Sequence, residues 1–141
     1  MDPDQRSVKE LELADKQWIE KTERLGLEIL DFYAGTSDAT PETLDAAFRK
    51  WKSDETQDRA PDDVVATGLG VLFGNYIVER KDCRWVVVTD KFGTELAVRA
   101  PDGSEVYPIN AVWKRIDPAN EDINFFEPIW TSVIERGMKD R

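Results

Sequence analysis

The stretch from Arg84 to Tyr107 constrains the fold more than any other, because strand-forming runs and turn residues alternate in it at hairpin spacing. Residues 84–89 and 94–99 are rich in β-branched side chains, and the turn Asp90–Gly93 separates them. A second turn around Gly103 leads into a third, shorter run. The sequence therefore predicts an antiparallel meander, with strands over residues 84–90, 94–100 and 105–107.

Helical periodicity flanks this meander on both sides. Apolar residues at three- and four-residue spacing predict an amphipathic helix over residues 6–33, or two helices with a break near Gly26. Its predicted buried seam is Val8, Leu11, Trp18, Leu25, Ile29 and Phe32, with Asp15 and Thr22 at the two remaining seam positions. Thr40 as a cap and Pro41 in the first turn predict a helix over 41–52. Further helices are predicted over residues 62–80, 109–116 and 123–137.

These elements define an α+β fold with N-terminal helices, a three-stranded antiparallel meander and C-terminal helices. The 141 residues, 40% of them apolar, fit one domain with its own core. We expect a single domain over residues 1–141, in which 1–57 form a helical N-terminal extension and 61–137 the sheet-containing core. Trp85, Trp113 and Trp130 are expected in the core, because each lies on an apolar periodic face.

Small residues recur on one face of the predicted helix over 62–80, at Ala66, Gly70 and Gly74. Such a face lets another element approach closely. The glycines do not match a nucleotide-binding motif. The third glycine comes one residue late for the dinucleotide fingerprint, no strand precedes the run, and no Lys-Ser or Lys-Thr follows it.

Several packing and turn motifs together resemble a known family. They are Gly68-Leu69-Gly70, the runs 84–88 and 92–98, Tyr107-Pro108 and the run 112–116. Over about residues 61–133 the chain resembles the bacterial family of domains of unknown function numbered 3806. The resemblance implies the fold and carries over no catalytic residue. It also suggests a small standalone bacterial protein, a category in which immunity proteins that neutralise secreted toxins are frequent.

The net charge of the chain limits the kinds of molecule that it can bind. Asp and Glu number 29 against 19 Lys and Arg, which gives a net charge of −10. Such a surface repels phosphate backbones and anionic lipid and attracts basic proteins. We therefore expect neither nucleic acid nor a membrane as partner. The first residues lack the order of a signal peptide, so a cytoplasmic location is expected.

Little in the sequence indicates catalysis. The chain has no His and one Cys, Cys83, which removes the commonest general base and metal ligand. We predict no enzymatic activity, no catalytic residue, no metal and no cofactor. The alternative is a small enzyme or ligand-binding domain that uses carboxylates near the sheet, drawn from Asp90, Glu95, Asp102 and Glu105.

The preferred hypothesis is a protein-binding module, most concretely an immunity protein that binds and neutralises a cognate basic bacterial toxin domain. The polar stretch over residues 53–60 is predicted to be a mobile acidic loop, because it has no apolar anchor. The predicted partner-binding residues are Asp54, Glu55, Asp58, Asp62, Asp63, Asp102 and Glu105. If the loop does not bind, Asp102, Glu105 and the segment 120–125 form the alternative surface.

Overall fold

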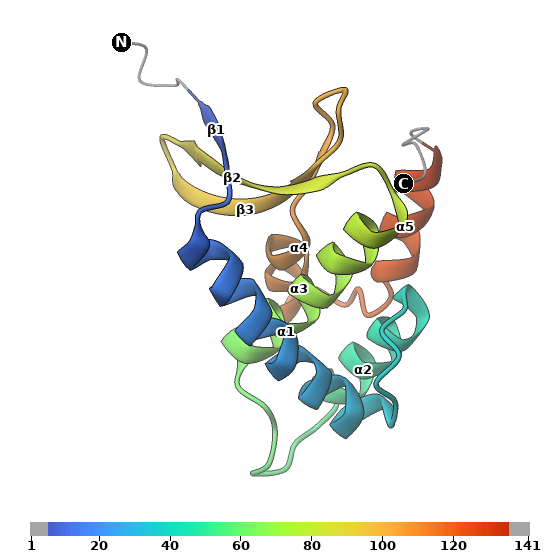
Figure 1. Ribbon diagram of the computed structural model, residues 1–141. Helices are drawn as coiled ribbons and strands as arrows, with labels where there is room; N and C mark the ends of the chain where they lie inside the picture. Colours follow the sequence, from blue (N-terminus) through green and yellow to red (C-terminus); the bar gives the residue numbers. More distant parts are fainter. Residues whose placement is uncertain (1–5, 136–141) are drawn as a thin grey trace.

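The computed structural model describes residues 6–135 as helices packed under one antiparallel sheet (Figure 1). The elements in chain order are β1 (Ser7–Glu10), α1 (Leu13–Ala34), α2 (Pro41–Lys52), α3 (Asp62–Arg80), β2 (Arg84–Asp90), β3 (Gly93–Arg99), β4 (Glu105–Val106), α4 (Pro108–Ile116) and α5 (Phe126–Glu135). The predicted α+β class is confirmed. The last two residues of the helix predicted over 123–137 lie outside the described residues.

The sheet has the strand order β1-β2-β3-β4 and separates two apolar clusters. Trp85 lies opposite Val98, and both belong to the main core, which is shared with the helices. Val86 lies opposite Ala97 on the other face, where they form a small second cluster with Val88. The alternation of strand side chains thus divides β2 and β3 between the two clusters.

The predicted three-stranded meander is confirmed as β2, β3 and β4. The strand β1 was not predicted, so the sheet has a fourth strand and the helix expected from residue 6 begins at Leu13. Val8 pairs with Val88 in an antiparallel ladder whose partner strand lies far along the chain. The spacing of apolar residues within a segment does not show that the segment pairs with a strand far away in the sequence. Val8 and Leu11 have helical spacing, but Asp15 belongs to a capping box at the start of α1 and accepts a hydrogen bond from the backbone of Glu12.

The predicted apolar seam of α1 is wrong at three positions, because Trp18, Leu25 and Phe32 are exposed. Thr22 and Ile29 of the predicted seam are buried, but the rest of the buried stripe lies one residue further along, at Ile19, Gly26, Leu30 and Tyr33. The helix is continuous through Gly26. A β-carbon built on Gly26 would lie 2.5 Å from the carbonyl oxygen of Gly68, so this glycine allows α1 and α3 to cross in close contact.

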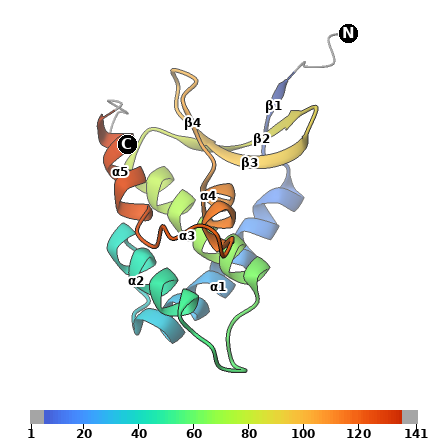
Figure 2. The same cartoon turned by 180° about the vertical axis from the view of Figure 1, so that it is seen from behind.

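The central helix is α3, with α1 on one side and α4 on the other (Figures 1 and 2). The predicted close approach on its small-residue face is confirmed. A β-carbon on Gly70 would lie 2.7 Å from the Cα atom of Ile109 in α4, and one on Gly74 would lie 2.0 Å from the ring of Trp85. At these two glycines, α4 and Trp85 of the sheet therefore pack directly against the backbone of α3.

Asp45 in α2 holds the start of α5 in place. Its carboxylate is 1% exposed and accepts hydrogen bonds from the backbone N–H groups of Phe125, Phe126 and Glu127, at 2.9, 2.9 and 3.1 Å. Lys52 also donates to the backbone of the preceding segment, at the carbonyl of Asn120. Because Phe125 is buried, the segment 120–125 is part of the core packing as well as of the surface.

Candidate partner-binding site

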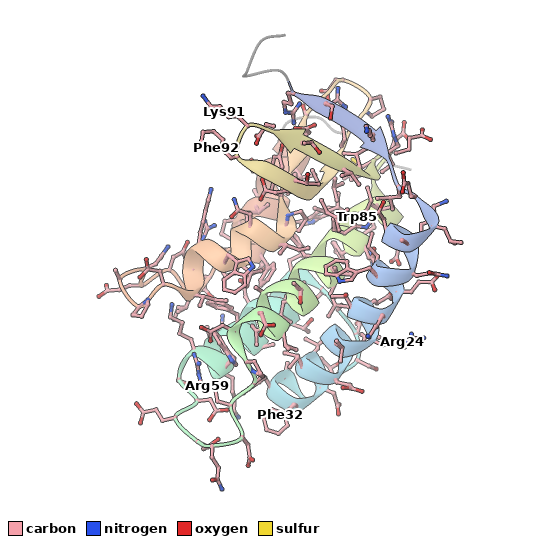
Figure 3. All side chains as sticks on the ribbon, turned by 90° about the vertical axis from the view of Figure 1, so that its left-hand side faces the viewer. Arg24, Phe32, Arg59, Trp85, Lys91 and Phe92 are labelled. Carbon is pink, nitrogen blue, oxygen red and sulfur yellow. The ribbon has the colours of Figure 1, made fainter. Side chains whose placement is uncertain are left out.

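The loop between α2 and α3 and the end of α1 enclose a cleft of about 440 Å³, which we call the acidic cleft. It is lined by Phe32, Tyr33, Lys50, Ser53, Asp54, Glu55, Thr56 and Asp58. Three of the seven predicted partner-binding acids are in this set. In Figure 3 the loop that carries Arg59 lies beside Phe32 at the lower end of the molecule.

The loop is anchored at several points, contrary to the prediction of a stretch without anchors. The Tyr33 hydroxyl donates to Asp54 Oδ2 (2.7 Å) and accepts from the backbone N–H of Ala60 (3.0 Å), which ties both ends of the loop to α1. The indole N–H of Trp51 donates to the carbonyl of Ala60 (2.8 Å). The guanidinium of Arg59 stacks over the Trp51 ring, 3.9 Å from its centroid. The loop therefore presents its remaining acids from a fixed frame.

Asp54 forms part of this frame. Besides Tyr33, it accepts hydrogen bonds from the backbone N–H and the hydroxyl of Thr56. The bond from Tyr33, followed by those from Thr56, holds the pKa of Asp54 below its usual value. The carboxylate is therefore ionised at neutral pH, and it accepts its hydrogen bonds from Tyr33 and Thr56.

The other predicted loop acids face solvent. Glu55, Asp58 and Asp63 are exposed, and no ion pair forms at them within residues 6–135. Asp62 pairs with Arg59 at 3.3 Å but remains about half exposed. Asp62 and Asp63 also lie in the first turn of α3, where the helix dipole stabilises negative charge. The acidic cleft is therefore bordered by carboxylates that remain available to a cationic surface.

Phe32 supplies an exposed aromatic surface in the same cleft. Its side chain is 64% exposed and packs edge-to-face on Tyr33, with ring centroids 4.8 Å apart. This exposed position was not predicted, because Phe32 has the spacing of the buried seam predicted for the first helix. A seam through Gly26 and Tyr33, facing the glycine-rich α3, is the sequence signal that would have placed Phe32 outside.

The structure does not bring Asp102 and Glu105 to this cleft. Both lie on the β3–β4 hairpin, at the opposite end of the molecule from the loop (Figures 1 and 2). Asp102 accepts a hydrogen bond from the backbone N–H of Ser104, which lowers its pKa. The predicted site residues therefore fall into two separate groups.

Glu105 is engaged inside the protein, with its side chain 10% exposed. It forms ion pairs with Arg6 and with Arg99, the latter at 2.8 Å, and accepts a hydrogen bond from Tyr107 at 2.9 Å. Burial raises its pKa, but the hydrogen bonds from Tyr107, Arg99 and Arg6 outweigh burial and leave the pKa below its usual value. Because Arg6 precedes β1 and Glu105 lies in β4, the pair connects the two outer strands of the sheet.

The carboxylates of the alternative hypothesis have separate local roles. Asp90 accepts a hydrogen bond from the backbone N–H of Phe92 and so stabilises the β2–β3 turn, as Asp102 does for the next turn. Across residues 6–135, no three His, Cys, Asp or Glu side chains come together in a way that could hold a metal ion. Cys83 is half-buried, and burial raises the pKa of its thiol, which lowers its reactivity.

The comparisons with known proteins define the family. Its sequence profile, described as "Domain of unknown function (DUF3806)", matches residues 43–126, which is more than half of the chain. The chain therefore belongs to this family, as its resemblance implied. The match starts in α2, earlier than the resemblance indicated, and ends where α5 begins. A search of curated proteins found no match.

A solved structure has a similar fold. It is a crystal structure of a protein from Bacteroides thetaiotaomicron VPI-5482, with a TM-score of 0.68 and 11% sequence identity. The alignment covers 93% of the present chain and 48% of the other, so this chain spans about half the length of that protein. At this identity the likeness concerns the fold alone. Among the described helices, none has the length and apolar content needed to cross a membrane.

Proposed function

We propose that this protein is a binding module that captures a basic protein at the acidic cleft, and most concretely an immunity protein that neutralises a cognate basic bacterial toxin domain in the cytoplasm. The observation that carries the proposal is an exposed aromatic ring, Phe32, packed on the buried Tyr33 and bordered by the free carboxylates of Glu55 and Asp58. Protein interfaces combine such aromatic anchors at the centre with charged groups at the rim.

The two parts of the surface have different effects on binding. The carboxylates attract a basic partner over a distance and raise the association rate, whereas the desolvated ring of Phe32 slows dissociation. The same negative charge disfavours nucleic acid and anionic lipid as partners. A function by occlusion rather than catalysis also agrees with a sequence that contains no His.

The proposal is tested by affinity capture from the native host with three baits. One is the wild-type protein, one carries Phe32→Ala, and one carries Glu55→Gln, Asp58→Asn, Asp62→Asn and Asp63→Asn together. We expect the wild type to capture a basic protein that both variants recover poorly. A fourth bait, the matched control, carries Glu10→Gln, Glu20→Gln, Glu28→Gln and Asp117→Asn, which changes the net charge equally at exposed positions outside the acidic cleft and the segment 120–125.

The captured protein is then expressed alone and together with the wild type in a heterologous bacterial host. Growth arrest by the partner alone, relieved by co-expression, supports the immunity role. A partner that is not toxic refutes that role and leaves a binding module. Equal capture by all four baits refutes the acidic cleft as the binding surface.

A further inference from the structure

A second cleft, of about 370 Å³, opens between the helix-facing side of β3 and the helices α1, α3 and α4. We call it the tryptophan cleft. It is lined by Asp15, Trp18, Thr67, Thr94, Glu95, Leu96, Ile109, Asn110 and Trp113, and it shares no residue with the acidic cleft. Its volume lies within the range of ligand-binding clefts, roughly 300–1,000 Å³.

Two tryptophans from different helices line this cleft and remain accessible. Trp18 of α1 is 40% exposed and Trp113 of α4 is 42% exposed, although both were predicted to be buried. The remaining apolar lining, Leu96 and Ile109, packs against the core beneath. Exposed indole rings in a concave site are the side chains that bind organic cations best.

The charge of the cleft selects for the same class of ligand. Of its nine lining residues, Asp15 and Glu95 are acidic and none is basic. One oxygen of Asp15 accepts the capping bond from Glu12 at the start of α1. Glu95 alternates with Leu96 along β3, so its exposed side chain leaves the sheet on the far face, beside Val88, and only its backbone borders the cleft on the helix side. A cationic group between the tryptophans would therefore meet the carboxylate of Asp15, which lies on the helix side of the cleft.

The cleft also borders an open strand edge. β4 pairs only with Val98 and Arg99 of β3, so across residues 6–135 no strand covers the stretch 93–97 on that side. Thr94, Glu95 and Leu96 of this stretch line the cleft. An uncovered edge offers backbone hydrogen-bonding groups to an extended peptide, and adjacent pockets then select its side chains.

We propose that the tryptophan cleft is a peptide-binding site, in which an extended segment of a partner protein pairs with the free edge of β3. An arginine or lysine of that segment lies between Trp18 and Trp113, with its charge against Asp15. The open edge favours a peptide over a free small cation, because a small cation leaves the backbone groups of β3 unused. This site is independent of the function proposed for the acidic cleft.

The experiment uses the peptide acetyl-Thr-Thr-Val-Arg-Val-Thr-Thr-amide as the probe. Binding is followed through the indole N–H resonances of Trp18 and Trp113, assigned with single Trp→Phe variants. We expect both signals to shift saturably. Replacing arginine with the neutral isostere citrulline should weaken binding by at least about fivefold, because it removes the cation–π and carboxylate interactions. Methylation of both valine nitrogens should also weaken binding, since it blocks strand pairing.

Variants locate the site. Asp15→Asn and Trp113→Ala should each weaken binding of the arginine peptide, and Asp15→Asn, which keeps an oxygen to accept the capping bond from Glu12, should leave the affinity for the citrulline peptide unchanged. The matched controls, Glu28→Gln and Phe32→Ala, remove an exposed acid and an exposed aromatic ring elsewhere on α1 and should bind like the wild type. Circular dichroism of each variant checks that the fold is intact.

Three results would overturn the proposal. Equal affinity for the arginine and citrulline peptides would show that the cleft does not select a cation. Equal affinity for the peptide and for free arginine amide would show that the strand edge makes no contribution. No saturable shift of either indole signal at millimolar peptide would show that the cleft is not a peptide site.

Discussion

Asp45 shows how much one side chain organises in this protein. Three backbone N–H groups at the start of α5 depend on its carboxylate, and the site is almost entirely buried. A charged acceptor at a helix N-terminus satisfies donors that the helix itself leaves unpaired.

Asp45→Ala should therefore lower the free energy of unfolding by about 2–4 kcal/mol, since it leaves buried donors without an acceptor. Asp45→Asn should cost less, because one oxygen remains. Urea denaturation measures both variants against Glu28→Ala, an exposed position on α1 where a change within about 0.5 kcal/mol is expected. An Asp45→Ala variant as stable as this control would contradict the anchoring role.

Glu105 gives a prediction about pH. Its pKa is lower in the folded protein than in the unfolded chain, because the bonds from Tyr107, Arg99 and Arg6 outweigh burial. The stabilisation is therefore present above the unfolded pKa of about 4.3 and is lost as the pH falls through the folded pKa. The gap in unfolding midpoint between the wild type and Glu105→Gln should be largest near neutral pH and should disappear in acid. A gap that widens in acid would reverse the sign of this assignment.

At the scale of the elements, the contacts around α3 depend on missing side chains. Gly74 meets the ring of Trp85 and Gly70 meets the backbone of α4, at distances that leave no room for a β-carbon. The gain in helix propensity from replacing glycine, about 1 kcal/mol, is smaller than the cost of forcing these elements apart.

Gly74→Leu and Gly70→Leu should each destabilise the protein by about 1–3 kcal/mol despite the better helix propensity of leucine. Ala14→Leu adds a similar side chain at an exposed position of α1 and is the control. Chemical denaturation decides the outcome. If both glycine variants unfold at the wild-type midpoint or above it, the close packing does not constrain these positions.

Elements with local signals could be predicted from the sequence, and elements without them could not. The helices over 41–52 and 62–80 match the structure, because Thr40, Pro41 and Pro61 mark their starts and apolar spacing marks their lengths. The strand β1 depends on a partner strand distant in sequence, which no local pattern encodes. The buried face of α1 was wrong because two apolar stripes lie side by side, and only packing against α3 selects one of them.

At the scale of the whole molecule, the predicted partner-binding residues lie in two separate places, the loop and the β3–β4 hairpin. The loop acids could be predicted because an acidic stretch between two helices is visible in the sequence. Their separation from Asp102 and Glu105 could not, since it depends on the sheet and the loop occupying opposite ends of the molecule (Figure 1). Figure 3 also shows that the loop and the sheet lie apart: Phe32 lies at the end near the loop, whereas Lys91 and Phe92 lie at the sheet, in the β2–β3 turn.

The association rate with the captured partner should fall as salt rises, because exposed charges are screened over about 8 Å at physiological ionic strength. Neutralising Glu55, Asp58 and Asp63 together should slow association and flatten this salt dependence, with little effect on stability. Surface plasmon resonance at two salt concentrations measures both effects. Association that responds to neither salt nor these substitutions would leave the loop acids without a role in recognition.

The pairing of β1 with β2 also sets an order of events during synthesis. Ser7 pairs with Thr89, so β1 cannot pair fully until the residues as far as Thr89 have left the ribosome. At about 5–20 residues per second, the intervening chain takes roughly 4–16 s to make. The helices α1, α2 and α3 are all synthesised within that interval. The strand β1 therefore stays without its sheet partner while three helices are made, and it joins the sheet only after they have left the ribosome.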